Sequence, residues 1–238
     1  MIQNLSLSII LPVYNEEENI KKVIKEIDDF FVSQDIFENY EIIIVDDGSK
    51  DRSSEILKEI RSHYSNIKAI SHHKNLGYGR ALISGVQSAR YPLFFFMDAD
   101  GQFNISEIDK LISHVEDYDI ITGYRHNRKD SFYRVMLGKI YSWLVFLLFG
   151  LKLKDINCGF KLFKRETLNL ENMYNSNGGV FYTKIFLKAK GYKIKEVPVE
   201  HFPRLKGKQT GASPRVIFDA MIDLIKLKYS SIRDKIKS

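Results

Sequence analysis

Phe-Phe-Phe-Met-Asp-Ala-Asp-Gly-Gln, at positions 94–102, joins a strand-like run to a polar motif. Four consecutive apolar residues predict a strand buried on both faces, as in a parallel sheet. Two carboxylates follow at once, Asp98 and Asp100, and their burial without partners would be unfavourable. Because ligands of open α/β sheets bind outside the carboxyl ends of the strands, we expect these two aspartates to face a cleft.

The spacing of these two carboxylates suits a hard divalent cation that is completed by the phosphates of a substrate. Asp-Ala-Asp-Gly is also common in simple turns, so the motif alone leaves both interpretations open. An EF-hand loop fits poorly, because Phe103 stands where the sharp-turn glycine is needed and Asp109 replaces the bidentate glutamate. The choice therefore depends on the rest of the chain.

Strand-like and helix-like segments alternate through the first half of the sequence. The strand-like runs cover residues 5–13, 41–45, 67–71, 94–97 and 119–123. This alternation predicts an α/β fold with a parallel twisted sheet and right-handed crossovers. Tyr14, Asp46 and Asp98 each follow one of these strands, and the carboxyl ends of parallel strands share one rim. Their expected convergence favours a metal and phosphate site over a simple turn.

The second half of the chain has two apolar segments with basic neighbours. Residues 132–151 are apolar nearly all round, and Arg134 and Lys139 interrupt them, so we expect a segment too short to span a membrane. This segment is either a core helix or an interfacial helix, and the basic residues before it favour the interfacial role. Ser213 and Pro214 predict the capped start of a last helix, which is either membrane-surface or packed on the domain. We therefore expect one domain over 1–211 and a basic amphipathic helix over 212–238.

The formal net charge of +6 is concentrated in the C-terminal part. From His201 onward there are nine Lys and Arg against three Asp and Glu, whereas residues 1–200 are balanced. A basic end on a neutral body indicates an anionic surface or substrate, although solvated lysines on an exposed helix give the same pattern. We expect no nucleic-acid partner. The single cysteine, Cys158, permits no internal disulfide and suits a reducing compartment, and we expect no signal peptide.

Several common motifs are absent or incomplete. The sequence Gly77-Tyr78-Gly79 is not a dinucleotide fingerprint, because Leu82 stands where the third glycine is needed. The sequence also lacks a P-loop, a His and Cys cluster with zinc spacing, and a G-x-S-x-G elbow. Hydride transfer, P-loop hydrolysis and serine acyl transfer are therefore not supported.

Several motifs together resemble family 2 glycosyltransferases of the GT-A fold. They are SIILPVYNE at 8–16, VDDGS at 45–49, Asn75 with Gly77, and DADGQ at 98–102. DINCGFKLF at 155–163 and EVPV at 196–199 extend the resemblance to the dolichol-phosphate mannose synthase or polyprenyl-phosphate hexosyltransferase branch. The resemblance implies a GT-A type α/β fold, with a Rossmann-like, mostly parallel twisted sheet flanked by helices. It also implies an inverting, metal-dependent transfer of a hexose from a GDP- or UDP-sugar to a polyprenyl phosphate.

The resemblance also implies roles for individual residues. The donor would be bound by Pro12, Tyr14, Glu16, Asp46, Asp98, Arg204 and Lys206, with Lys208 on the same loop. Asp98, Asp100 and Gln102 would surround Mg²⁺ or Mn²⁺, and Asp98, Asp100 and Arg125 would be catalytic. Arg125 would bind the acceptor phosphate, although Tyr124 replaces the serine that the branch usually has before it. For each cation of the loop, a solvated surface charge is the alternative.

One departure from the family bears on the acceptor. Related members often carry a glutamate in a pattern like Phe-x-x-Glu-Leu, whereas residues 181–186 read Phe-Tyr-Thr-Lys-Ile-Phe, with Lys184 at that place. A hydroxyl acceptor that needed a general base from this helix would lack it. A phosphate monoester needs none, because its second pKa is about 6 and it is largely dianionic at neutral pH. The departure therefore favours a lipid phosphate.

The sequence thus predicts a cytoplasmic enzyme that lies peripherally at the cytoplasmic face of a membrane. The nearest alternative is the same fold acting on a hydroxyl of a saccharide, lipid or protein. A sugar-phosphate nucleotidyltransferase would normally show a glycine-rich N-terminal loop, which residues 12–17 do not supply. A non-catalytic membrane-associated scaffold is the third alternative.

Overall fold

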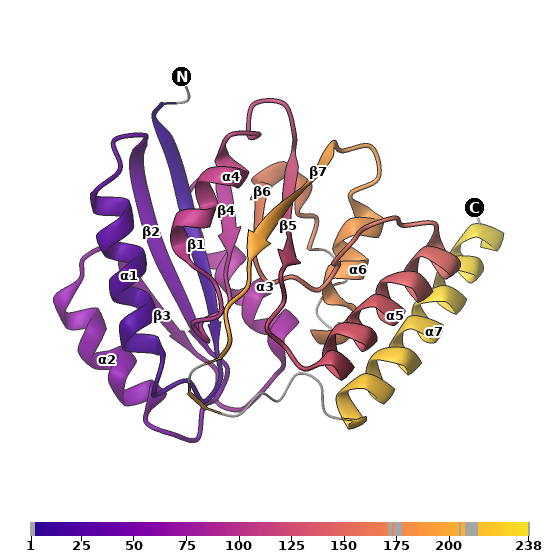
Figure 1. Ribbon diagram of the computed structural model, residues 1–238, viewed down its shortest axis with the longest axis horizontal. Coiled ribbons are helices and arrows are strands. Elements are labelled where there is room, and N and C mark those ends of the chain that lie inside the picture. The colour runs from indigo at the N-terminus through magenta and orange to yellow at the C-terminus, as the bar shows by residue number, and fades with distance from the viewer. Residues whose placement is uncertain (1–2, 171–172, 174–177, 205, 208–213, 238) are drawn as a thin grey trace.

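The computed structural model describes residues 3–170, 173, 178–204, 206–207 and 214–237. A seven-stranded sheet with the order β3-β2-β1-β4-β6-β5-β7 runs through its centre, with helices on both faces (Figure 1). The strands are β1 Leu5–Val13, β2 Phe37–Asp46, β3 Ile67–Ser71, β4 Leu93–Phe96, β5 Ile120–His126, β6 Lys161–Lys164 and β7 Ile194–Glu200. β6 is antiparallel to β4 and β5, and the other pairs are parallel. The predicted α/β class with a mostly parallel sheet is confirmed.

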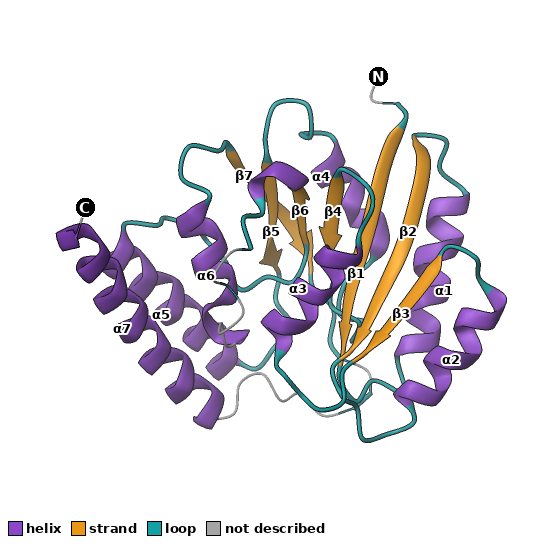
Figure 2. Cartoon of the chain, turned by 180° about the vertical axis from the view of Figure 1, so that it is seen from behind, coloured by secondary structure: helices purple, strands orange, loops and turns teal. Residues whose placement is uncertain are grey.

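The helices form two layers around this sheet. They are α1 Ile20–Val32, α2 Ser53–His63, α3 Tyr78–Ser88, α4 Asp109–Ile112, α5 Phe132–Phe149, α6 Gly178–Lys188 and α7 Pro214–Lys237, with short 3₁₀ turns η1 Ile105–Ile108 and η2 Arg165–Thr167. α1, α2 and α4 lie on the face seen in Figure 1, and α3 and α6 lie on the face seen in Figure 2.

The central strands are buried on both faces, which is why they contain uninterrupted apolar runs. Successive side chains of a strand point to opposite faces. Accordingly, Ile9 and Phe95 pack in the core beneath α1 and α4, whereas Ile10, Phe94 and Phe96 pack in the core beneath α3 and α6. The two cores fix the register of β1 and β4, because a slip by one residue would exchange the faces. The carboxyl ends of β1, β2 and β4 therefore lie at one rim of the sheet.

β6 enters the sheet between β4 and β5, in the opposite direction to both. The sequence predicted a turn and a strand over 155–161, without a position in the sheet. The insertion brings the segment that precedes β6 back across the rim, beside the carboxyl end of β4. β7 pairs only with β5 in the described sheet, which agrees with the predicted edge strand over 195–199.

α5 and α7 lie side by side at one end of the molecule (Figures 1 and 2). Only Ser142 and Val145 of α5 are buried, so α5 is not a core helix. It has 18 residues, and among the described residues it is the single helix that is long and apolar enough to cross a membrane, judged by length and composition alone. The expectation that this segment is too short to span a membrane is therefore not supported.

α7 packs on the domain as well as presenting an apolar stripe. Leu224 is buried in the core beneath α3 and α6, and Lys228 donates a hydrogen bond to the Leu148 carbonyl at the end of α5. Met221, Ile225 and Tyr229, spaced by four residues, are exposed. The predicted cap at Ser213 and the predicted boundary between residues 211 and 212 lie outside the described residues.

Candidate active site

Asp98 and Asp100 lie just beyond β4 at the rim, as the sequence predicted. Asp98 packs so closely on Gly159 that a Cβ added there would lie 2.2 Å from its Oδ2 atom. Only glycine at position 159 leaves room for the carboxylate, and this explains why a glycine lies just before β6. Burial, and then the negative charge of Asp100, raises the pKa of Asp98 to about 6. Burial also raises the pKa of Asp100.

Two tyrosine hydroxyls form a row of hydrogen bonds that ends at Asp98. The Tyr78 hydroxyl donates to Asp98 Oδ1 at 2.8 Å, and the hydroxyls of Tyr78 and Tyr182 are also 2.8 Å apart. Tyr78 is the first residue of α3, and Tyr182 lies in α6, on the same side of the sheet. Neither tyrosine was predicted to be a site residue, because aromatic residues in a helix normally pack in the core.

Arg204 reaches into the site from the segment after β7. Its Nη2 atom lies 2.7 Å from both carboxylate oxygens of Glu16, and its Nη1 atom lies 3.5 Å from Asp100 Oδ2. Burial raises the pKa of Glu16, although Asn19 and Arg204 both oppose the rise. The guanidinium therefore holds a positive charge between two carboxylates at the rim. Lys206 is exposed, and Lys208 lies outside the described residues.

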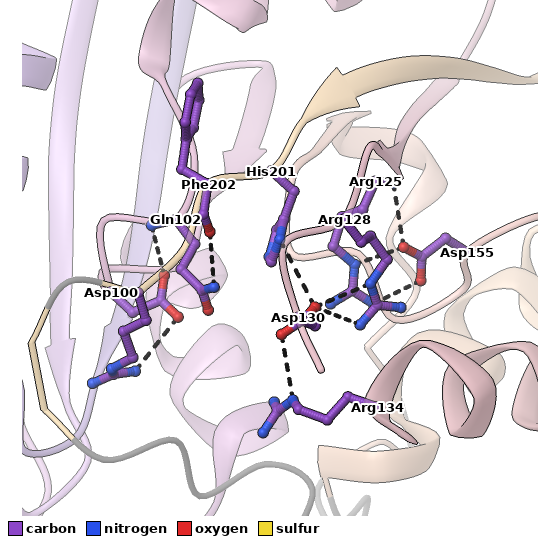
Figure 3. A network of polar contacts seen from close by, with 10 residues as sticks. Asp100, Gln102, Arg125, Arg128, Asp130, Arg134, Asp155, His201 and Phe202 are labelled. Carbon is purple, nitrogen blue, oxygen red and sulfur yellow. Dashed lines mark hydrogen bonds and ion pairs between the residues drawn. The ribbon is translucent and has the colours of Figure 1, made fainter. Parts of the chain in front are cut away.

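Gln102 fastens this segment to the end of β4 (Figure 3). Its Nε2 atom donates to the Phe202 carbonyl at 3.0 Å, and the Phe202 amide donates back to the Gln102 carbonyl at 2.9 Å. The Gln102 backbone amide donates to Asp100 Oδ1 at 3.1 Å. The predicted metal ligand Gln102 is thus engaged through its amide nitrogen in a clamp that holds the residues before Arg204.

Two cavities open at the rim, and Tyr14 lines both. The first, of about 420 Å³, is also lined by Asp46, His73, Lys74 and Asn75. The second, of about 270 Å³, is lined by Glu16 and Gly207 among others. Tyr14 thus lies beside Asp46 in the first cavity and beside Glu16 in the second, and the donor-binding role of these residues stays a prediction. Asp46 also accepts a hydrogen bond from the Ser49 amide at 2.9 Å. Pro12 lies within β1 in register with Val45 and lines neither cavity.

Asp47, adjacent to Asp46, accepts hydrogen bonds from the loop that borders the first cavity. Its carboxylate accepts hydrogen bonds from His72 Nδ1 and from the amides of Leu76 and Gly77, at 2.7, 2.9 and 2.7 Å. These three partners come from the segment between β3 and α3. Asp47 therefore holds the wall of the cavity, while Asp46 faces the cavity itself.

The predicted phosphate ligand Arg125 is paired with Asp155. Its Nε and Nη2 atoms donate to the two carboxylate oxygens at 2.7 and 2.9 Å. Burial disfavours the charge of Arg125, but Asp155 outweighs this effect and raises the pKa of the guanidinium. The sequence placed Asp155 only within a family motif, so the pairing of these two residues was not predicted.

Two further arginines and a histidine surround Asp130 (Figure 3). Arg128 donates to its carboxylate at 2.8 and 3.0 Å, Arg134 Nε lies 3.4 Å away, and His201 Nδ1 lies 3.8 Å away. Burial, and then the charge of Arg125, lowers the pKa of His201 to about 4, so the imidazole is neutral at pH 7. Together with the pair of Arg125 and Asp155, the cluster has three guanidinium groups and two carboxylates, an excess of positive charge. In the sequence, Arg128 is one of the basic residues that precede the 132–151 segment and Arg134 interrupts that segment, so neither was predicted to lie in the site.

Lys161, the first residue of β6, is fully buried next to the tyrosines. Its Nζ atom donates to Thr122 Oγ1 at 2.5 Å and lies 4.7 Å from the centroid of the Tyr182 ring. Burial lowers the pKa of Lys161 to about 8. The sequence analysis quoted Lys161 within a motif but did not predict a buried ammonium group.

The oxygen atoms at this site are of the kind that binds a divalent cation. Carboxylate oxygens are the ligands that Mg²⁺ and Mn²⁺ prefer, and Arg204 already places one positive charge beside Asp100. Among the described residues, no three His, Cys, Asp or Glu side chains form a complete metal site. Two carboxylates alone would leave a divalent cation short of ligands, so a cation held by Asp98 and Asp100 would need substrate phosphates to complete its coordination.

Comparison with known proteins gives a family match and curated relatives, one of which is described here. Residues 8–174 match the family described as "Glycosyl transferase family 2". The undecaprenyl-phosphate 4-deoxy-4-formamido-L-arabinose transferase of Edwardsiella ictaluri (strain 93-146) is 27% identical over 221 residues. That match covers 92% of this chain and 66% of the relative, so the chain spans just under two thirds of the relative's length.

Solved structures are similar in fold. The mannosyl-3-phosphoglycerate synthase from Rubrobacter xylanophilus has a TM-score of 0.67 at 16% identity, covering 98% of this chain and 76% of that one. The glucosyl-3-phosphoglycerate synthase from Mycobacterium tuberculosis, in complex with Mn²⁺ and UDP-glucose, has a TM-score of 0.63 at 20% identity. That match covers 92% of this chain and 79% of that one.

Proposed function

The chain belongs to glycosyl transferase family 2 and has the GT-A fold, and we propose that it transfers a hexose from a nucleotide-diphosphate sugar to a polyprenyl phosphate. The transfer inverts the anomeric carbon and depends on Mg²⁺ or Mn²⁺. The observation that carries this proposal is the pair of half-buried carboxylates, Asp98 and Asp100, beside a cluster with excess positive charge.

The donor nucleotide occupies the cavities at the rim. Tyr14 and Asp46 line the larger cavity, whose volume of about 420 Å³ suits a nucleoside. The carboxylates lie farther along the same rim, where the diphosphate belongs. A similar fold has been solved with Mn²⁺ and UDP-glucose, which supports a nucleotide-diphosphate sugar as the donor class.

Asp98, Asp100 and Arg204 stabilise the negative charge of the leaving diphosphate. Asp98 and Asp100 would hold the cation, which supplies positive charge to the departing diphosphate when it is bound. Gln102 acts by fixing the segment that carries Arg204, and Glu16 holds the guanidinium at the rim. Arg204 is then in position to turn from Glu16 to a phosphate oxygen, with Lys206 and Lys208 on the same loop.

The acceptor attacks as a phosphate oxygen from the face opposite the leaving diphosphate, through an oxocarbenium-like state. α6 contains no aspartate or glutamate between Gly178 and Lys188, so this helix supplies no general base. A phosphate dianion needs none. The Arg128 and Arg134 groups around Asp130 supply positive charge for it, and Arg125 acts through Asp155 by ordering the turn before β6.

The apolar stripes of α5 and α7 would meet the membrane that carries the acceptor. Trp143 and Leu147 of α5 are 59% and 63% exposed, and both helices carry further exposed apolar residues. A lipid surface would cover this area, because exposed apolar patches mark contact sites. The curated relative's name specifies undecaprenyl phosphate, which supports a lipid-borne acceptor and a position at a membrane surface.

The test is an acceptor comparison with a panel of labelled nucleotide sugars. The panel includes GDP- and UDP-hexoses and a UDP-arabinose derivative, because the relative's name specifies an arabinose. We expect label to enter the organic phase only with polyprenyl phosphate and Mg²⁺ or Mn²⁺ present. Transfer to polyprenol or to a soluble sugar, with none to polyprenyl phosphate, would instead support a hydroxyl acceptor.

A further inference from the structure

We propose that Tyr78 and Tyr182 form a positioning pair that holds Asp98 in the orientation in which it binds the divalent cation. The inference rests on the proposed metal role of Asp98 and extends it to two residues on other elements. The Tyr78 hydroxyl donates to Asp98 Oδ1 at 2.8 Å, and the Tyr182 hydroxyl lies 2.8 Å from that of Tyr78.

The direction of both hydrogen bonds follows from the chemistry of the groups. An ionised carboxylate only accepts hydrogen bonds, so Tyr78 must donate its single hydroxyl proton to Asp98. The proton shared between the two hydroxyls therefore comes from Tyr182. The result is a directed chain from Tyr182 through Tyr78 to Asp98, and a bond to a charged acceptor is the stronger kind.

Neighbouring residues hold the two tyrosines and the Asp98 carboxylate in place. Tyr182 is buried in the core beneath α3 and α6, and the partly buried ring of Tyr78 packs against this core, with the two ring centroids 5.9 Å apart. The Lys161 ammonium lies 4.7 Å from the centroid of the Tyr182 ring, and a cation over a phenol ring strengthens the hydroxyl as a donor. Gly159 closes the other side of the Asp98 carboxylate. The carboxylate is thus fixed on two sides before any cation arrives.

This arrangement has a defined consequence for metal binding. A carboxylate that is already oriented loses less conformational freedom when it binds a cation, and partners of metal ligands typically change metal affinity by 10- to 100-fold. Removal of the Tyr78 hydroxyl should therefore weaken the metal site, while turnover with saturating metal changes little. Tyr182 acts only through Tyr78, so removal of its hydroxyl should have a smaller effect in the same direction.

The test compares Tyr78→Phe, Tyr182→Phe and the control Tyr141→Phe. Tyr141 is another tyrosine that packs, partly buried, against the same core, and its hydroxyl bonds the Gly179 carbonyl and Thr183 rather than a carboxylate of the site. Electron paramagnetic resonance of free Mn²⁺, without nucleotide and with UDP or GDP corrected by a protein-free titration, measures the Mn²⁺ affinity of the protein, and thermal unfolding reports the fold. We expect an affinity loss of about tenfold for Tyr78→Phe, a smaller loss for Tyr182→Phe, and none for Tyr141→Phe. The Mn²⁺ concentration that gives half-maximal turnover should rise in the same order, with kcat nearly unchanged.

Two results would overturn the inference. Wild-type Mn²⁺ affinity in a folded Tyr78→Phe variant would remove the positioning role while leaving the proposed function intact. A loss of Mn²⁺ affinity in Tyr182→Phe larger than that in Tyr78→Phe would contradict the order of the hydrogen bonds from Tyr182 through Tyr78 to Asp98. If Tyr78→Phe does not fold, wild-type Mn²⁺ affinity in Tyr182→Phe would contradict the inference. No Mn²⁺ binding by the wild-type protein would instead reject the metal role in the proposed function, and this inference with it.

Discussion

Arg204 Nη2 lies 2.7 Å from both carboxylate oxygens of Glu16, across 188 residues of sequence. The contact joins the loop after β1 to the segment after β7 and closes one side of the rim. It also explains how a basic loop residue is held beside Asp100 without a substrate phosphate. An arginine in this position balances two carboxylates and can exchange one of them for the diphosphate of a donor.

Replacement of Arg204 by Gln should therefore reduce turnover by about 10²-fold, the loss typical of one donor that stabilises a developing negative charge. The donor KM should rise as well, because the guanidinium no longer meets the diphosphate. Steady-state kinetics with varied donor measures both effects. The control is Arg61→Gln on the exposed face of α2. Unchanged donor kinetics in Arg204→Gln would show that the loop does not contact the donor.

The cluster around Asp130 predicts a separate effect on the acceptor. Replacement of Arg134 by Gln should raise the KM for polyprenyl phosphate about tenfold, since one hydrogen bond to a charged group contributes about 1.5–3 kcal/mol. Arg134 Nε is buried without a hydrogen-bond partner among the described residues, and a phosphate oxygen would satisfy it. Donor KM should stay constant. The matched control is Lys129→Gln, because Lys129 is exposed in the same segment. Equal acceptor KM values for both variants would relocate the acceptor phosphate.

Lys161 predicts a pH-dependent stability. Its pKa is about 8 in the folded protein and about 10.5 when exposed, so between these values the unfolded chain binds more protons. Stability therefore rises with pH across this window, and below pH 8 the buried charge destabilises the fold by up to about 3 kcal/mol. The free energy of unfolding of Lys161→Met minus that of the wild type should fall as the pH rises from about 8 to about 10. Urea unfolding at several pH values measures this difference, and a constant difference would show that Lys161 titrates normally.

The exposed stripe of α5 predicts membrane association. Replacement of both Trp143 and Leu147 by Asn should weaken binding to vesicles that contain phosphatidylglycerol by at least about tenfold, because each side chain contributes about 1.5–3 kcal/mol when it is buried. Vesicle co-sedimentation measures the bound fraction. Val32→Asn on α1 is the control, since Val32 is 72% exposed on another helix. Equal binding of the double variant and the control would exclude α5 as the contact.

The sheet and its rim could be predicted because both depend on local patterns. Apolar runs such as 94–97 identify buried strands, and the residues that follow them, including Asp98, must lie at the carboxyl ends. The position of β6 could not be predicted, because an antiparallel strand inserted between β4 and β5 depends on long-range pairing. The local sequence of 161–164 contains no information on its neighbours.

The same distinction applies to the site. Asp98, Asp100, Tyr14 and Asp46 were found from their position after strands. The pairing of Arg125 with Asp155 was missed, because the sequence shows two charges but not which of them meet in space. Tyr78 and Tyr182 were missed for a related reason, since a hydroxyl that bonds a carboxylate 20 residues away has the same sequence pattern as a core aromatic residue.

The most direct test of the central claim is calorimetric titration of nucleotide-diphosphate sugar into the wild-type protein and into Asp98→Asn and Asp100→Asn. We predict binding by the wild type that requires Mn²⁺ or Mg²⁺, and loss of this binding in both variants. Both variants should unfold at or above the wild-type temperature, because burial raises the pKa of each carboxyl and its charge destabilises the fold. Equal donor binding by all three proteins in excess EDTA would contradict the claim that this carboxylate pair holds a cation at the donor diphosphate.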